Sequence, residues 1–319
     1  MTDLFFHTPD NPFPDNATAG FLTAHDGRKI RYARFAPASR PDNGTVVLLQ
    51  GRNECIEKYF ETITDLSAKG FGVATFDWRG QGGSDRLLRN PQRGYVKSFR
   101  DYASDLEQFF EEVVLPDCRG PYYILAHSTG ALVALLTASS MVNRVQRMVL
   151  LTPFLGIPGQ RVSMARIRLV TTILSLFGLG RLYAAWGPRP KQSAPFETNN
   201  LTSDAARYRR NTSIYEAHPQ LALGGPTIRW LRAASSAAIA VSDQEFMANI
   251  RIPTLIIAAG ADTVVSTKAV ASYARHLRLS SLLTIDGARH ELLQEADLYR
   301  EQTLAAFHAF IPGTDGSAS

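Results

Sequence analysis

The sequence predicts an α/β protein in which a mostly parallel central sheet is flanked by helices and interrupted by an inserted helical cap. Short strands rich in Val, Ile and Leu alternate with amphipathic helices, as in parallel sheets covered on both faces. Between residues 154 and 246 the strand patterns vanish and helical patterns dominate, and the alternation then resumes. We therefore expect a core domain of residues 1–153 and 247–319 and a helical cap subdomain of residues 154–246.

The core begins with two strands joined by a tight turn. Residues 17–24 and 29–37 flank His-Asp-Gly-Arg, in which Asp-Gly favours a hairpin. The remaining strands are apolar runs, and the helices between them show a 3.6-residue periodicity. Further strands are expected at 45–50, 72–78, 122–125, 147–153, 254–260 and 281–286, and helices at 56–69, 99–115, 267–278 and 291–311.

Composition narrows the class of protein. Hydrophobic residues make up 45% and charged residues 20% of the chain, which is typical of a globular fold. The N-terminus lacks the basic and apolar regions of a secretory signal, and Cys55 and Cys118 form neither a metal-binding nor a disulfide pattern.

The uncharged stretch 120–143 contains His-Ser-Thr-Gly, so a buried strand and helix explain it better than a membrane span. We expect a cytoplasmic protein with reduced thiols and with no metal or organic cofactor.

A polar turn interrupts the apolar segment YYILAHSTGALVALL, residues 122–136. A strand, a sharp turn bearing Ser and a helix together form the nucleophile elbow, which raises the serine hydroxyl above the sheet. Ala126 and Gly130, two residues to either side of Ser128, are small enough for strand and helix to approach closely. The turn alone would equally fit a serine that only caps the helix.

A nucleophilic serine needs an imidazole to take its proton and a carboxylate to orient that imidazole. In this fold the chain order is Ser, acid, His, with each residue after a strand. Asp262 follows the strand at 254–260, and His290 follows the strand at 281–286. Asp286 is a rival acid, although Asp286-Gly287 is typical of a turn. Three of the remaining histidines precede or adjoin Ser128: His7, His25 and His127. Two lie in helical patterns, His276 and His308, and His218 precedes Pro in the cap.

These segments resemble the α/β-hydrolases of the lysophospholipase and monoacylglycerol lipase type, a group also labelled serine aminopeptidase-like. QGRNECIEKY and DWRGQGGSD, starting at residues 50 and 77, are similar to two of its conserved loops, and AHSTG, GAD and GARHEL are similar to its three triad loops. The cap segments 201–210 and 216–234 are most similar to bacterial lysophospholipases. Two positions depart from the pattern, because Gln50 replaces a His and Ala126 replaces a Gly.

The resemblance implies a carboxylester hydrolase that acylates Ser128 and uses His290 first as base and then as acid. By position, the backbone amide of Arg52 would be one oxyanion donor, and the amide of Thr129, at a helix N-terminus, would be the other. The substrates implied are lysophospholipids or monoacylglycerols. Amide or peptide hydrolysis, as by an aminopeptidase, and a non-catalytic binding protein remain as alternatives. The basic cap disfavours an aminopeptidase, which needs acidic groups for its substrate's amine.

The net charge of +5 belongs to the cap, where eleven Arg or Lys face five acids. Within the cap, the uncharged and mostly apolar stretch 169–180 lies between Arg168 and Arg181 and is too short to span a bilayer. Such a stretch suits an interface with anionic lipid, so we hypothesise peripheral contact with the inner membrane face. The alternative is an ordinary cap helix packed on the acyl pocket. Nucleic acid is not an expected partner, because no binding motif or dense basic run occurs.

Overall fold

A computed structural model describes residues 4–40, 42–159, 163–184, 187 and 195–312 of the chain. Three basic residues of the expected cap, Arg161, Arg189 and Lys191, lie outside these described residues. No helix in the described ranges combines the length and the apolar character needed to cross a bilayer.

An eight-stranded sheet forms the centre of the molecule, with the strand order β1-β2-β4-β3-β5-β6-β7-β8. β1 and β2 are antiparallel to each other, β2 is antiparallel to β4, and all other neighbours are parallel. This confirms the expected mostly parallel sheet that opens with a hairpin. The strands are β1 (Ala17–Thr23), β2 (Lys29–Phe35), β3 (Thr45–Leu49), β4 (Gly72–Phe76), β5 (Tyr122–His127), β6 (Val145–Leu151), β7 (Thr254–Ala259) and β8 (Ser280–Ile285).

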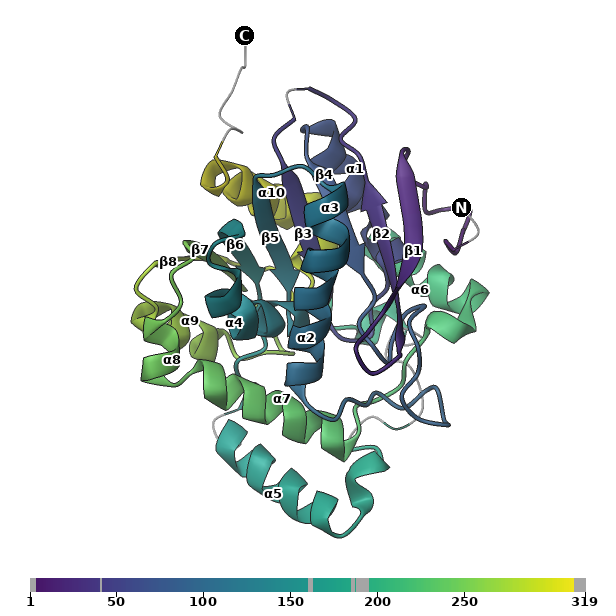
Figure 1. Ribbon diagram of the computed structural model, residues 1–319. Helices are drawn as coiled ribbons and strands as arrows, with labels where there is room; N and C mark the ends of the chain where they lie inside the picture. Colours follow the sequence, from purple (N-terminus) through teal and green to yellow (C-terminus); the bar gives the residue numbers. More distant parts are fainter. Residues whose placement is uncertain (1–3, 41, 160–162, 185–186, 188–194, 313–319) are drawn as a thin grey trace.

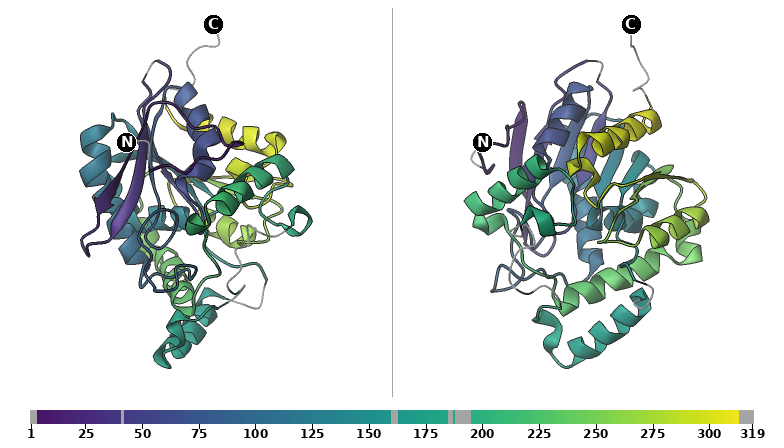
Figure 2. Two further views of the ribbon diagram at one scale, coloured as in Figure 1. Left: turned by 90° about the vertical axis from the view of Figure 1, so that its right-hand side faces the viewer. Right: turned by 180° about the vertical axis from the view of Figure 1, so that it is seen from behind.

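Helices cover both faces of the sheet (Figures 1 and 2). One apolar cluster joins a sheet face to α2 (Phe99–Phe109), α4 (Thr129–Met141) and α9 (Thr267–His276). The opposite cluster joins the other face to α1 (Phe60–Ala68) and α10 (Asp297–Phe310). A 3₁₀ turn (Ile56–Tyr59) precedes α1, and a π-helical turn (Phe110–Val114) and α3 (Leu115–Asp117) extend α2. Burial of Val/Ile/Leu-rich strands on both sides explains why their sequences read as continuous apolar runs.

The described part of 154–246 is helical, and it lies between β6 and β7. Its helices are α5 (Met164–Leu176), α6 (Ala205–Ala217), α7 (Ile228–Val241) and α8 (Gln244–Ala248), with short 3₁₀ turns at Leu179–Arg181, Phe196–Thr198 and Pro219–Leu221. α7 contributes Trp230 and Ala234 to the core cluster that contains α2 and α4. α5 lies on the outer side of α7, at the end of the molecule far from α10 (Figure 1).

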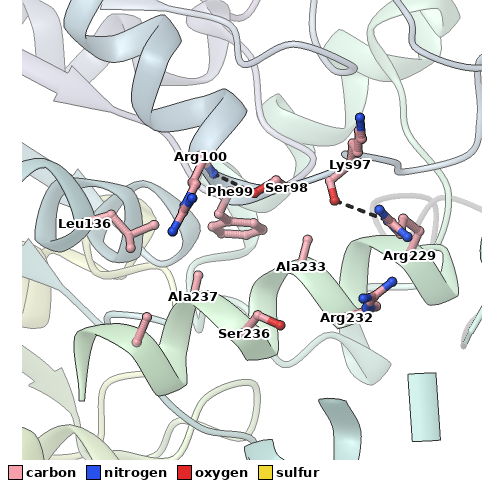
Figure 3. A pocket seen from close by; sticks show the side chains of 11 residues that line it. Lys97, Ser98, Phe99, Arg100, Leu136, Arg229, Arg232, Ala233, Ser236 and Ala237 are labelled. Atoms are coloured by element: carbon pink, nitrogen blue, oxygen red, sulfur yellow. Dashed lines mark hydrogen bonds between the residues drawn. The ribbon is translucent and has the colours of Figure 1, made fainter. Parts of the chain in front are cut away.

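A cavity of about 340 Å³ lies between the start of α2 and one side of α7 (Figure 3). Its wall carries four basic side chains, two from α7 and two from the start of α2: Arg229, Arg232, Lys97 and Arg100. Arg229 donates from Nε to the carbonyl oxygen of Lys97 at 3.2 Å. This cavity contains none of the sequence-predicted site residues.

The last helix begins later than the sequence pattern predicts. The pattern predicts one helix from about residue 291 to 311, but Leu292–Gln294 form a 3₁₀ turn and α10 starts at Asp297. The carboxylate of Glu295 accepts hydrogen bonds from the amides of Arg289 at 2.6 Å and Ala296 at 3.0 Å. Side-chain bonds to the backbone thus replace the helical ones just after the loop that carries His290.

Candidate active site

The turn between β5 and α4 places Ser128 in a strained backbone conformation. Its φ is 50° and its ψ is −108°, values that a non-glycine residue adopts only when its surroundings impose them. Position 130 needs a glycine. A Cβ added at Gly130 would lie 2.5 Å from the carbonyl oxygen of Leu49 and 2.6 Å from that of Gln50. The Ser128 side chain makes no capping hydrogen bond to α4, which argues against the simple capping role.

The structure brings Ser128, His290 and Asp262 into one hydrogen-bonded chain. His290 Nε2 lies 3.1 Å from Ser128 Oγ, and His290 Nδ1 lies 2.7 Å from Asp262 Oδ2. Each residue stands in a loop at the carboxyl end of a strand: β5, β8 and β7. With Nδ1–H donating to the carboxylate, Nε2 is free to accept the serine proton, which is the arrangement that general-base catalysis requires.

Asp262 is fixed independently of His290. Its Oδ1 accepts the amides of Val264 at 2.7 Å and Val265 at 2.9 Å. Burial alone would raise the pKa of Asp262, but the hydrogen bond and charge of His290 and the two amides lower it overall. The carboxylate is therefore ionised and oriented. The rival Asp286 is exposed in the turn whose next residue, Gly287, has a φ of 79°.

Two backbone amides near Ser128 are available to a ligand. In the part of the chain that the structure describes, the N–H groups of Arg52 and Thr129 donate to no acceptor. The loop that carries Arg52 is held by Glu54, whose carboxylate accepts the Gly51 amide. Gln50 supports the loop from below, because its Nε2 donates to Asp77 Oδ1 at 3.1 Å. Both amides thus remain as candidate oxyanion donors.

A buried group of charges behind this loop was not predicted from the sequence. Lys58 Nζ lies 2.8 Å from Glu54 Oε1 and 2.7 Å from Glu291 Oε1. Tyr59 donates its hydroxyl to Glu54 Oε2 at 2.6 Å. Burial tends to raise the pKa of Glu54, but the charge of Lys58 and the hydrogen bonds of Lys58 and Tyr59 bring it down to about 2. The available sequence signal was the i,i+4 spacing of Glu54 and Lys58, which fits an exposed helix pair equally well.

His127 and Thr152 connect the serine loop to the histidine loop, and neither was assigned a role from the sequence. Thr152 donates its hydroxyl to the His290 carbonyl oxygen at 3.1 Å and lies 3.2 Å from His127 Nδ1. The His127 ring centre is 4.8 Å from that of His290. Burial lowers the pKa of His127 to about 3, although the nearby carboxylate of Glu54 opposes this shift. His127 is therefore a neutral packing partner of His290 at pH 7.

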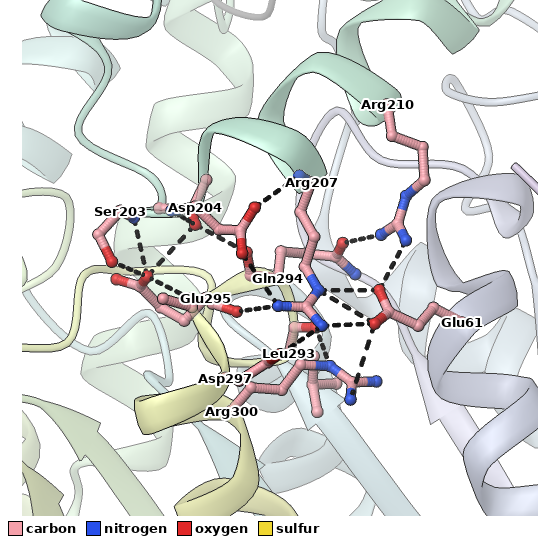
Figure 4. Close-up of polar contacts among 12 residues, drawn as sticks. Glu61, Ser203, Asp204, Arg207, Arg210, Leu293, Gln294, Glu295, Asp297 and Arg300 are labelled. Atoms are coloured by element: carbon pink, nitrogen blue, oxygen red, sulfur yellow. Dashed lines mark hydrogen bonds and ion pairs between the residues drawn. The ribbon is translucent and has the colours of Figure 1, made fainter. Parts of the chain in front are cut away.

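Ion pairs fasten α6 to both the core and the histidine loop (Figure 4). Arg207 binds Glu61 of α1 through Nε and Nη2, at distances down to 2.6 Å, and donates from Nη1 to the Glu295 carbonyl oxygen at 2.8 Å. Arg210 adds a 2.6 Å bond to Glu61. Burial raises the pKa of Glu61, but the hydrogen bonds of these two arginines lower it to about 2. α6 is thus attached to the loop that follows His290.

A cavity of about 290 Å³ opens above Ser128. Apolar side chains from the loop after β6, from α7 and from the loop after β7 line one part of it: Phe154, Ile157, Trp230, Leu231 and Val264. Arg52, Asn53 and Asn200 are among its polar lining residues. Within the described ranges, no three His, Cys, Asp or Glu side chains are grouped so as to hold a metal ion.

The strand order, the strained serine turn and the loops that carry Asp262 and His290 define an α/β-hydrolase. The family model described as serine aminopeptidase, S33 matches residues 40–297. The chain belongs to this family of hydrolases, as its sequence motifs predicted.

Individual proteins agree with this placement. Lysophospholipase L2 of Escherichia coli is 32% identical over 306 residues, covering 91% of this chain and 85% of that protein. The probable lysophospholipase L2 of Haemophilus influenzae is 29% identical and covers 94% of both chains. The crystal structure of a monoacylglycerol lipase from Paleococcus ferrophilus is similar in fold, with a TM-score of 0.69, 20% identity and coverage of 88% of this chain and 98% of that one.

Proposed function

We propose that the chain hydrolyses the acyl ester of single-chain lipids, lysophospholipids or monoacylglycerols, through an acyl-enzyme on Ser128. The observation that carries the proposal is the hydrogen-bonded chain from Ser128 through His290 to Asp262 at the base of a partly apolar cavity. The names of the curated relatives, which are lysophospholipases, support the choice of lipid substrate.

In the acylation step, Ser128 Oγ attacks the ester carbonyl carbon while its proton passes to His290 Nε2. The carbonyl oxygen becomes an oxyanion and accepts hydrogen bonds from the amides of Arg52 and Thr129. His290 then returns the proton to the leaving glycerol oxygen. Water repeats the sequence on the acyl-enzyme and releases the fatty acid. Loss of one oxyanion donor in such a site typically costs about 2.7–4 kcal/mol of barrier.

The size and lining of the cavity favour an ester with one acyl chain. Phe154, Ile157, Leu231 and Val264 offer apolar contact from different loops and from α7. A cavity of about 290 Å³ is near the lower end of ligand pockets, which span roughly 300–1,000 Å³. One acyl chain fits this space better than the two chains of an intact phospholipid would.

The aminopeptidase alternative needs free carboxylates for the substrate's amino group. Glu54 and Glu291 line the cavity, but both carboxylates bind the ammonium of Lys58. Lys58 thus already occupies the position that a substrate amine would take between them. Ester hydrolysis needs no such amine site, so the buried group of charges favours the lipid substrate.

Membrane contact forms a second part of the proposal. α5 exposes large apolar side chains along its outer surface and at its end, with Leu176 80% and Phe177 76% exposed. Leu169, Val170 and Ile173 are also exposed, and Arg168 and Arg181 flank this apolar surface. Apolar side chains bordered by cations fit an anionic bilayer surface, where each nearby Lys or Arg contributes roughly 1 kcal/mol.

Vesicle sedimentation tests the membrane contact. Wild type should sediment with anionic vesicles and less with zwitterionic ones, and the double variant Leu176→Asp/Phe177→Asp should lose most of this binding. Leu298→Asp is a matched control, because Leu298 is 68% exposed on α10 at the opposite end of the molecule. Equal sedimentation of both variants with wild type would count against contact through α5.

Hydrolysis assays and active-site labelling test the enzymatic proposal. Wild type should turn over lysophospholipids, monoacylglycerols and p-nitrophenyl esters, and a fluorophosphonate probe should label it. Ser128→Ala should abolish both turnover and labelling. Turnover of aminoacyl anilides alone would overturn the lipid assignment, and absence of labelling of Ser128 would support a non-catalytic binding protein.

A further inference from the structure

Arg52 carries a positive charge that no carboxylate pairs with in the described part of the chain. Its Nη2 donates to the Gly224 carbonyl oxygen, its guanidinium carbon lies 5.4 Å from the Trp230 ring centre, and its Nε is buried without a hydrogen-bond partner. Burial lowers the pKa of the guanidinium to about 10, while Tyr102 and Tyr183 oppose this shift. The group is still protonated at neutral pH, so the cavity wall carries an unpaired cation.

The position of this guanidinium is built into the fold. A Cβ added at Gly94 would lie 2.5 Å from Arg52 Nη2, so the guanidinium packs directly on the backbone there. The Trp230 ring lies within cation–π range of the same group. Arg52 and Ser128 line one cavity, whose carboxylates Glu54 and Glu291 are occupied by Lys58.

We propose that the Arg52 side chain binds the phosphodiester of a lysophospholipid head group while the ester of the same molecule lies at Ser128. This inference rests on the function proposed above and assigns the polar half of its substrate. Phosphate oxygens match the planar guanidinium, which can donate two parallel hydrogen bonds to them. One glycerol unit joins the ester to the phosphate. The amide of Arg52 is the proposed contact of the ester oxygen, and its guanidinium contacts Gly224 and Trp230, which line the same cavity.

The charge balance of the cavity predicts a substrate preference. A buried cation without a partner is unfavourable, and a bound phosphodiester would neutralise it. A monoacylglycerol with the same acyl chain has no charged group and would leave Arg52 unpaired. We therefore expect wild type to prefer lysophospholipids, with the difference appearing chiefly in KM.

The test compares lysophosphatidylethanolamine with a monoacylglycerol that carries the same acyl chain. The ratio of their kcat/KM values should fall about 10- to 100-fold in Arg52→Gln, the range expected for hydrogen bonds to a charged group, and less in Arg52→Lys. Gly94→Ala, which displaces the guanidinium without removing it, should lower the same ratio. Arg275→Gln serves as the control, because it removes an exposed charge on α9. Melting temperatures report whether each variant is folded.

An equal loss on both substrates in Arg52→Gln and Gly94→Ala would overturn the inference and indicate a purely structural role for the side chain. That result would leave the proposed hydrolase function intact, because wild type would still turn over both lipids. Failure of wild type to hydrolyse either lipid would instead contradict the proposed function and, with it, the assignment of Arg52.

Discussion

The ammonium of Lys58 lies 2.7 Å from Glu291, the residue directly after His290. The same ammonium binds Glu54, which holds the Gly51 amide in the loop of the candidate oxyanion donor Arg52. One buried cation therefore links the loops that carry the candidate general base and the candidate oxyanion site. Such a link makes the two loops dependent on each other.

Replacing Lys58 should damage both stability and activity. Lys58→Met leaves two buried carboxylates without their cation, and breaking a buried pair in this way typically costs about 3–5 kcal/mol. Denaturant unfolding and ester hydrolysis would measure the two effects. Lys268→Met, which alters an exposed lysine on α9, should change neither. A Lys58→Met protein as stable as wild type would show that the carboxylates do not depend on the ammonium.

Asp262→Asn should abolish most activity while leaving the fold intact. Because Val264 and Val265 donate to Oδ1, the new carboxamide would keep its oxygen there and direct its NH₂ towards His290 Nδ1. The imidazole would then carry its proton on Nε2 and could not accept the proton of Ser128. A fall of about 10⁴-fold in kcat is expected, as for the same exchange in other triads. Retention of more than a tenth of the activity would argue that Asp262 does not orient His290.

Gly130→Ala should move the chain around the elbow. Its methyl group would press on the carbonyl oxygens of Leu49 and Gln50, and the backbone there cannot easily yield. We expect a loss of about 1–3 kcal/mol in the free energy of unfolding, together with a lower kcat, because the Arg52 loop would shift. Ala126→Gly, on the other side of Ser128, creates no clash and should lower activity less. A lower kcat in Ala126→Gly than in Gly130→Ala would contradict this explanation.

His127 should make the protein sensitive to acid. Its imidazole takes up a proton near pH 6.5 when unfolded but only near pH 3 when folded. The unfolded state therefore binds more protons between these values, and the free energy of unfolding decreases as the pH falls through this window. The contribution is at most about 1.4 kcal/mol per pH unit. Melting curves of His127→Gln between pH 4 and 7 should show a smaller slope, whereas His25→Gln, in the exposed β1–β2 turn, should match wild type.

Glu61→Gln should loosen the attachment of α6. The substitution weakens the bonds from Arg207 and Arg210, and amide hydrogen exchange in α6 should become faster. The pKa of Glu61 is about 2 in the folded protein and 4.5 in the unfolded chain. Its contribution to the stability of wild type is therefore fully present above pH 4.5 and is lost as the pH falls towards 2. Glu301→Gln, at an exposed position on α10, is the matched control. Unchanged exchange in α6 would show that other contacts hold this helix.

The sequence predicted the sheet and the three residues that the structure brings together, because both depend on local patterns. Apolar runs mark buried strands, and the loops after β5, β7 and β8 reach the same edge of a parallel sheet. The group formed by Lys58, Glu54 and Glu291 could not be predicted in this way. It joins positions more than 230 residues apart, and neither partner's neighbourhood signals the other.

The end of the His290 loop shows the same limit. Its apolar periodicity favoured a continuous helix from residue 291, yet α10 begins at Asp297. The carboxylate of Glu295 accepts amides of its own loop and, at 2.8 Å, the amide of Ser203 just before α6, a contact that only the folded chain creates. The start of α10 could therefore not be predicted from local helix propensity, because a long-range hydrogen bond to Ser203 helps to fix the backbone there.

The attachment of α6 has a consequence for how substrate reaches the site. Arg207 fixes this helix to α1 and to the Glu295 carbonyl oxygen in the loop that follows His290, so any large outward swing of α6 would also pull on that loop. α5, in contrast, packs chiefly on α7. Substrate would accordingly enter and leave while the side of the molecule held by α6 stays in place during each turnover.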